Sequence, residues 1–112
     1  MGIVIKKGAS IDDCGAEILR GLISVEPVFT RAGVDVVVTS GSENYPHTAK
    51  RSAHYRGDAV DLRIKHVHVD KRGRVVAAIK RKLGPNFVVI HECKGTPQEH
   101  IHIHWSPVYA GV

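Results

Sequence analysis

The stretch EHIHIHW at residues 99–105 decides how this chain folds, because histidine and isoleucine alternate along it. Successive side chains of a β-strand point to opposite faces of a sheet. The alternation therefore predicts a strand whose three histidines share one face, while two isoleucines pack into the core behind them. The histidine face must then either be open to water or line a site.

Two elements before this strand follow from hydrophobic periodicity. Residues 87–92 predict a second strand, which pairs with the histidine strand through the turn at 94–98. Residues 70–83 have apolar side chains at helical spacing among many lysines and arginines. This pattern predicts a basic amphipathic helix that Asp70 caps and Gly84 ends.

The first half of the chain predicts another helix and two more strands. Residues 12–32 have helical periodicity, although we expect Pro27 to break this helix into two pieces. Residues 34–39 and 59–64 predict strands, and the polar segment 41–56 between them predicts a long loop. The order helix, strand, loop, strand, helix, hairpin indicates the α+β class, with a small antiparallel sheet and helices packed on it.

Size and charge limit the classes of protein to consider. A chain of 112 residues can bury one ordinary core, so we expect a single domain over residues 1–112. The net charge of +5 favours a polyanionic partner such as nucleic acid, anionic lipid or the bacterial wall. No secretory signal and no stretch of roughly 20 apolar residues is recognisable. We therefore expect synthesis in the cytoplasm and no membrane partner, and we expect a monomer.

The stretch SAHYRGDAVD at residues 52–61 carries two candidate metal ligands. His54 lies in the predicted loop, and Asp61 points away from the apolar face of the next strand. Zinc binds imidazole nitrogen and carboxylate oxygen; Gly57 would let the backbone turn tightly, and the small Ala59 would leave room for the ion. On their own, these two residues suit a surface histidine and a solvated aspartate equally well.

Together, the two stretches resemble the zinc D-alanyl-D-alanine carboxypeptidase and dipeptidase family, which includes phage L-alanyl-D-glutamate endolysins and is structurally related to hedgehog amino-terminal domains. The family pattern Ser-x-His-x-x-Gly-x-Ala-x-Asp is matched at every fixed position within residues 52–61. The resemblance covers residues 34–107 and implies a hedgehog-like or DD-peptidase-like fold. It also implies one zinc per chain, held by His54, Asp61 and, from the family's later His-x-His or Glu-x-x-His motif, His102.

The same resemblance implies hydrolysis by a metal-activated water, with two candidates for the proton transfers. Glu99 matches the general base of the Glu-x-x-His motif, and His100 matches the leading histidine that assists catalysis in other members. In a regular strand Glu99 would face away from His102, so either the turn extends to Glu99 or His100 takes the role. His91 and Glu92 lie on the neighbouring strand, where one of them could line the cleft or orient a ligand.

Substrate binding is where the chain departs from the family pattern. Family members place an arginine in a Ser-Gly-x-Arg context, whereas residues 40–43 read Ser-Gly-Ser-Glu. A guanidinium suits a substrate carboxylate, and three cations of the adjacent loop could replace the missing one: Lys50, Arg51 and Arg56. Ser52 is either a substrate contact or a turn residue that bonds the backbone. His104, on the same face as His102, completes the candidate substrate-binding set.

The sequence thus predicts a zinc peptidase that cuts peptidoglycan peptides, of the DD-carboxypeptidase or L-Ala-D-Glu endopeptidase type. Such an enzyme acts on the bacterial cell wall, and the lack of a recognisable secretion signal fits a phage endolysin. One alternative is a non-catalytic zinc-bearing binding module of the same fold, which the missing arginine favours. Another is a basic nucleic-acid-binding protein that uses the helix at 70–83. We expect no nucleic-acid partner, because that alternative leaves the histidine cluster unexplained.

Overall fold

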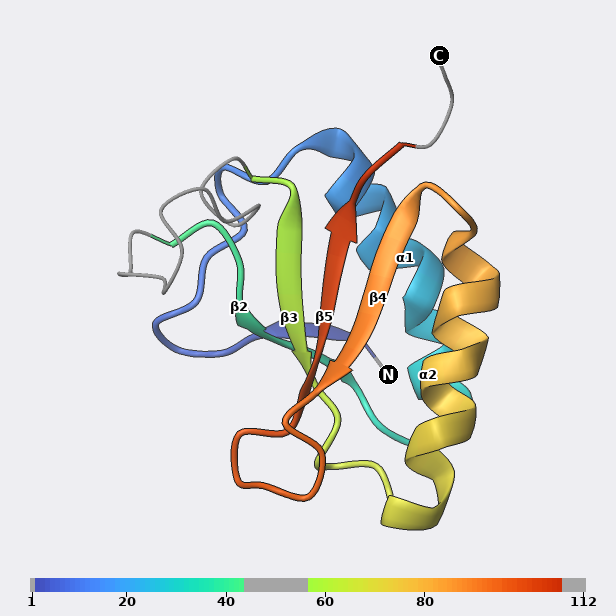
Figure 1. Cartoon of the computed structure of the whole chain (residues 1–112). Helices are drawn as coiled ribbons and strands as arrows, with labels where there is room; N and C mark the ends of the chain where they lie inside the picture. Colours follow the sequence, from blue (N-terminus) through green and yellow to red (C-terminus); the bar gives the residue numbers. More distant parts are fainter. Residues whose placement is uncertain (1, 44–56, 108–112) are drawn as a thin grey trace.

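The computed structural model describes residues 2–43 and 57–107, and it shows one five-stranded sheet with two helices (Figure 1). The elements in chain order are β1 (Ile3–Ile5), α1 (Ala16–Arg31), β2 (Val36–Ser40), β3 (Ala59–Arg63), α2 (Val69–Leu83), β4 (Phe87–Glu92) and β5 (His100–Trp105). Both helices contact each other and pack on the same face of the sheet (Figure 1). In the described parts of the chain the other face carries no helix, so side chains on it can form a site.

The sheet has the strand order β1-β2-β3-β5-β4. β2, β3, β5 and β4 are antiparallel neighbours, whereas β1 runs parallel to β2. The predicted α+β class is confirmed, but the sheet is mixed rather than purely antiparallel. β1 was not predicted, because its three residues are too few to show a period and all of them are exposed.

The core lies between the sheet and the helices, and the alternation in β5 places its two isoleucines there. Ile101 and Ile103 are 0% and 3% exposed, respectively. Leu62 and Val60 of β3 lie opposite them in the register and are buried on the same face. Both helices contribute fully buried side chains, among them Val25 and Phe29 from α1 and Ile79 from α2.

Helix α1 continues through Pro27, so the expected break is wrong. Proline cannot donate a hydrogen bond to the carbonyl four residues earlier, which here belongs to Ile23. Ile23 and Pro27 both lie on the exposed side of the helix, where water can bind that carbonyl. Meanwhile Val25 and Phe29, both 0% exposed, hold the helix against the core on either side of the proline.

Two glycines allow segment 10–15 to pack closely against the ends of β2 and β3. Gly57 has φ +74, and a Cβ there would come within 2.2 Å of the carbonyl oxygen of Asp13. A Cβ on Gly41 would come equally close, 2.2 Å, to the carbonyl oxygen of Ser10. The tight turn expected at Gly57 is therefore present, and it anchors the start of the strand that carries Asp61.

The alternation in β5 predicts unequal costs for two isoleucine truncations in paired strands. Ile101→Ala removes a fully buried side chain and should lower the free energy of unfolding by about 3 kcal/mol. Ile90→Ala, on the open face of β4 at 42% exposure, should lower it by less than about 1 kcal/mol. Urea denaturation of both variants measures the difference. Equal losses would mean that the core does not lie on the isoleucine face.

Candidate metal centre

The open face of the sheet is arranged in rows across β3, β5 and β4. Residues that lie opposite each other in an antiparallel sheet share a face. The register gives three such rows: Arg63, His100 and Glu92; Asp61, His102 and Ile90; and Ala59, His104 and Val88. All three histidines of β5 therefore project from the open face, where His102 lies opposite Asp61 of β3 and His100 lies opposite Glu92 of β4.

Asp61 lies between two of these histidines. Its Oδ1 is 2.9 Å from Nδ1 of His102, and its Oδ2 is 3.9 Å from Nε2 of His100. The chain of contacts continues outward, because His102 Nε2 lies 3.0 Å from His104 Nδ1 and His100 Nε2 lies 3.1 Å from Glu92 Oε1. These side chains are partly exposed, at 19% for Asp61, 16% for His102 and 24% for His100. A small ligand can therefore reach them.

The structure brings together some of the predicted site residues. Asp61 and His102, two of the three expected zinc ligands, are adjacent, and His100 and His104 flank them. Five expected residues lie outside the described parts of the chain: Lys50, Arg51, Ser52, His54 and Arg56. The third expected zinc ligand, His54, is among these residues.

The donor atoms on this face suit a metal ion. Asp61, Glu92 and His100 can each offer one ligand atom such that all three atoms lie within 4.8 Å of one another. Carboxylate oxygen and imidazole nitrogen are ligands that zinc accepts. Asp61 and His102 could also be two ligands of one zinc ion. Their oxygen and nitrogen atoms lie 2.9 Å apart, close to the distance of about 3.3 Å between two ligands of a tetrahedral zinc. Glu92 belongs to the group because it lies opposite His100 in the register of β4 and β5. The sequence predicted both strands, so this pairing could have been found from it.

Glu99 is placed differently from the predicted general base. β5 begins at His100, and the Glu99 side chain, 5% exposed, turns to the helix side of the sheet. Its Oε1 accepts hydrogen bonds from Arg72 Nη1 at 2.9 Å and from the Gly95 amide at 3.3 Å, and its Oε2 lies 2.6 Å from His91 Nε2. Both oxygens are thus engaged away from Asp61 and His102. The structure gives the predicted base role of Glu99 no support, whereas the alternative, His100, belongs to the candidate metal group formed by Asp61, Glu92 and His100.

The contacts of Glu99 also set its charge. The hydrogen bond with His91 lowers the pKa of the Glu99 carboxyl, and the Gly95 amide and the Arg72 charge act in the same direction against the effect of burial. The carboxylate is therefore held ionised. It connects α2 to the turn between β4 and β5, directly behind His100.

Glu43, which stands where the family pattern has an arginine, has a structural role. One carboxylate oxygen accepts hydrogen bonds from the amides of Gly41 at 2.6 Å and Ser10 at 3.1 Å, and the other accepts one from the Ser40 hydroxyl. Burial alone would raise the pKa of this carboxyl, but these hydrogen bonds together lower it. Glu43 thus fastens the end of β2 to segment 10–15.

Comparisons of the chain with protein-family models, with curated proteins and with solved structures gave no match. The resemblance described above accordingly depends on the two sequence motifs themselves. Neither helix in the described parts of the chain has the length and apolar character needed to cross a bilayer.

Glu99→Gln should lower the free energy of unfolding by about 2 kcal/mol near neutral pH, because it weakens charged hydrogen bonds to Arg72 and His91. A lowered folded pKa stabilises the protein above the ordinary value of 4.5, and this contribution is lost as pH falls through the folded pKa. The difference between wild type and variant should therefore shrink below pH 4.5. Urea denaturation at several pH values measures it.

Glu26→Gln is the matched control, since the Glu26 carboxylate accepts only an exposed hydrogen bond from Thr30. It should change the free energy of unfolding by less than about 0.5 kcal/mol. If the two substitutions have the same effect, the Glu99 contacts do not stabilise the fold.

Proposed function

We propose that this protein is a zinc-dependent peptidase that hydrolyses peptide bonds of bacterial peptidoglycan, with a hedgehog-like or DD-peptidase-like fold. The observation that supports it most is the position of Asp61 between His100 and His102 on the open face of the sheet. The motif match over residues 52–61 supplies the reaction class, and the alternating histidines supply the remaining donors.

In this proposal, zinc is held by Asp61 and His102 together with His54, which lies outside the described residues. A competing set consists of Asp61, Glu92 and His100. When bound, zinc would polarise a peptide carbonyl and make a coordinated water acidic at neutral pH. Both sets include Asp61, so Asp61 is the ligand that the proposal cannot do without.

His100 is the residue that we assign to proton transfer. Its Nδ1 lies 2.7 Å from the Gln98 carbonyl oxygen, which can only accept, so Nδ1 carries a proton. Its Nε2 faces the carboxylates of Glu92 and Asp61, at 3.1 Å and 3.9 Å. The ring is thus oriented by Gln98 and presents Nε2 to the metal group, where it can take up or release a proton.

Asp61→Asn tests both ligand sets, and His100→Gln distinguishes one set from the other. Asp61→Asn should abolish stoichiometric zinc binding, whereas Asp12→Asn, an exposed aspartate outside the group, should retain about one zinc per chain. If His102 is the ligand, His100→Gln should keep its zinc and hydrolyse peptide about 10²–10⁴-fold more slowly, because a proton-transfer group is lost. If His100 is the ligand, His100→Gln should lose the zinc. Elemental analysis of the purified variants and a peptide-release assay measure both quantities.

Hydrolysis itself is tested by incubating the protein with defined muropeptides and weighing the products by mass spectrometry. We expect cleavage that a chelator abolishes and added zinc restores. The masses also identify the bond that is cut, which separates the carboxypeptidase type from the L-Ala-D-Glu endopeptidase type. Stoichiometric zinc without cleavage of any muropeptide would instead indicate the binding module, and absence of zinc would refute the proposal.

A further inference from the structure

In the neutral ring of His100, one nitrogen faces two carboxylates without a proton to share. The ring proton is on Nδ1, which lies 2.7 Å from the Gln98 carbonyl oxygen. Nε2 then has a lone pair, and it lies 3.1 Å from Glu92 Oε1 and 3.9 Å from Asp61 Oδ2. Ionised carboxylates also only accept hydrogen bonds. A cation between the three atoms, either a proton on Nε2 or a metal ion, would turn this repulsion into attraction.

The distances suit a metal ion better than a proton. A proton on Nε2 would bond Glu92, but 3.9 Å is too long for a hydrogen bond to Asp61 as well. Ligand atoms of one zinc ion lie about 2.0–2.2 Å from it, and thus roughly 3–4 Å from each other. The three donor atoms here all lie within 4.8 Å of one another. Among the described residues the Glu92 carboxylate has no partner except His100, so it is available to an ion.

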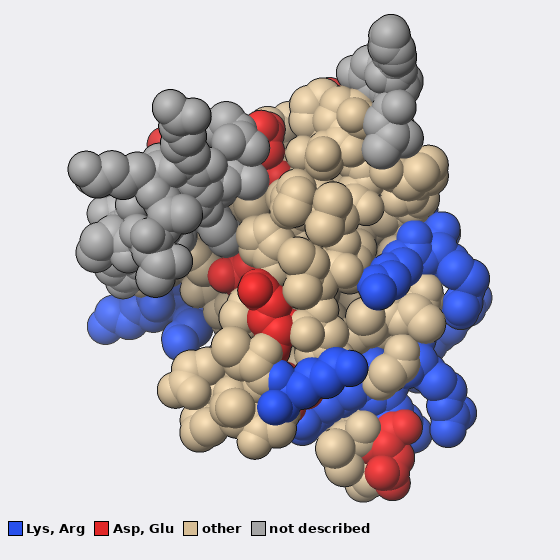
Figure 2. Space-filling model, in the orientation of Figure 1, with Lys and Arg blue, Asp and Glu red and all other residues tan. Residues whose placement is uncertain are grey.

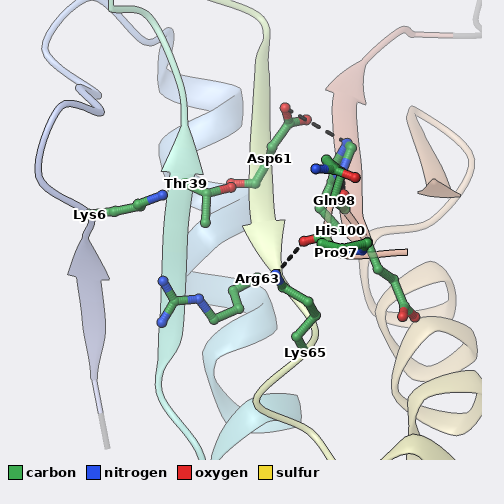
Figure 3. Close-up of a pocket in the computed structure, with 9 residues that line it drawn as sticks. Lys6, Thr39, Asp61, Arg63, Lys65, Pro97, Gln98 and His100 are labelled. Carbon is green, nitrogen blue, oxygen red and sulfur yellow. Dashed lines mark hydrogen bonds and ion pairs between the residues drawn. The ribbon is translucent and has the colours of Figure 1, made fainter. Parts of the chain in front are cut away.

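Asp61 directs its two oxygens to different histidines. Oδ1 lies 2.9 Å from His102 Nδ1, whereas Oδ2 faces His100 Nε2. Figure 3 shows the carboxylate reaching from β3 toward His100 on β5. A carboxylate can bind one ion through each oxygen, and the ions of two-metal sites lie about 3.5–4 Å apart. The His102 side and the His100 side of Asp61 can therefore bind zinc at the same time instead of competing for it.

An ion can reach the His100 side from solvent. A pocket of about 400 Å³ has both Asp61 and His100 in its walls, and the Glu92 side chain is 41% exposed. One imidazole nitrogen with carboxylate oxygens suits zinc, whereas calcium and magnesium prefer oxygen ligands alone. Zinc affinity should be lower here than on the His102 side, because the exposed Glu92 must be ordered and the charge of the first ion repels the second.

We propose that Asp61, Glu92 and His100 bind a second zinc ion, with Asp61 bridging it to the first ion on the His102 side. One zinc per chain remains the expectation when free zinc is scarce. A zinc ion on His100 Nε2 occupies the lone pair that would otherwise take up a proton, so excess zinc should inhibit hydrolysis. This inhibition rests on the proposed peptidase function, whereas the binding of a second ion is measured without any substrate.

The number of zinc ions per chain tests the site directly. The full chain is dialysed against rising concentrations of free zinc, and bound zinc is measured by elemental analysis. We expect the wild type to hold about one zinc at low free zinc and about two at high free zinc. Glu92→Gln and His100→Gln should each keep the first ion and bind the second about tenfold more weakly. Glu26→Gln, at an exposed position of α1, is the matched control and should hold both ions.

Hydrolysis gives an independent readout. Cleavage of muropeptides by the wild type should fall in step with occupancy of the second site, and removal of the weaker ion by dialysis should restore it. Glu92→Gln should need about tenfold more zinc to lose the same fraction of its own activity. The comparison is made within each variant, so a change in basal activity does not affect it.

A second zinc that Glu92→Gln and His100→Gln bind as tightly as the wild type would overturn the inference. If Glu92→Gln loses the only zinc, the two ligand sets are one site and the inference also fails. Cleavage by a protein that binds a single zinc at every concentration would leave the peptidase standing and refute the second site alone. Two zinc ions with the expected variant effects, in a protein that cleaves no muropeptide, would support the second site and refute the peptidase. Cleavage that the second ion does not slow would refute the inhibition.

Discussion

The register between β3 and β5 is the constraint on which the site depends. Asp61 lies directly opposite His102, and on the reverse face Leu62 lies opposite Ile101. A slip of one residue would turn the histidines of β5 into the core and expose its isoleucines. Burial of Leu62 and Ile101, both 0% exposed, therefore fixes the position of Asp61 against His102, although neither apolar residue touches the open face.

The second constraint acts at the end of β5 where the metal group lies. Glu99, Arg72 and His91 form a nearly buried polar cluster on the helix side of the sheet. Glu99 directly precedes His100 in the chain. The cluster joins three elements: α2, the end of β4 and the turn that leads into β5. The polar residues on the two sides of the sheet thus have different roles. The Glu99 cluster fixes the turn, whereas Asp61, Glu92 and His100 on the open face form the group that could hold a metal ion.

The sequence predicted the hairpin with correct ends, because β5 alternates over six residues, β4 begins with the apolar run Phe-Val-Val-Ile, and a turn separates them. It also predicted Asp61 and His102 on the open face. It could not decide between Glu99 and His100 for proton transfer, since the direction of a side chain at a strand end depends on tertiary contacts such as that with Arg72. Arg63 was not among the predicted site residues, although it lies on the same face as Asp61, two residues further along β3.

The distribution of charge on the open face limits where an anionic group can bind. Figure 2 shows acidic side chains near the middle of this face, with lysines and arginines below them, at the left edge and along the side formed by α2. An anionic group placed over Glu92 would meet a like charge at short range, which disfavours binding. Over β2 it meets Arg63 and Lys6 instead. An anionic group therefore meets favourable charge at the β2 end of the open face, and Asp61 and His100 lie between that end and Glu92.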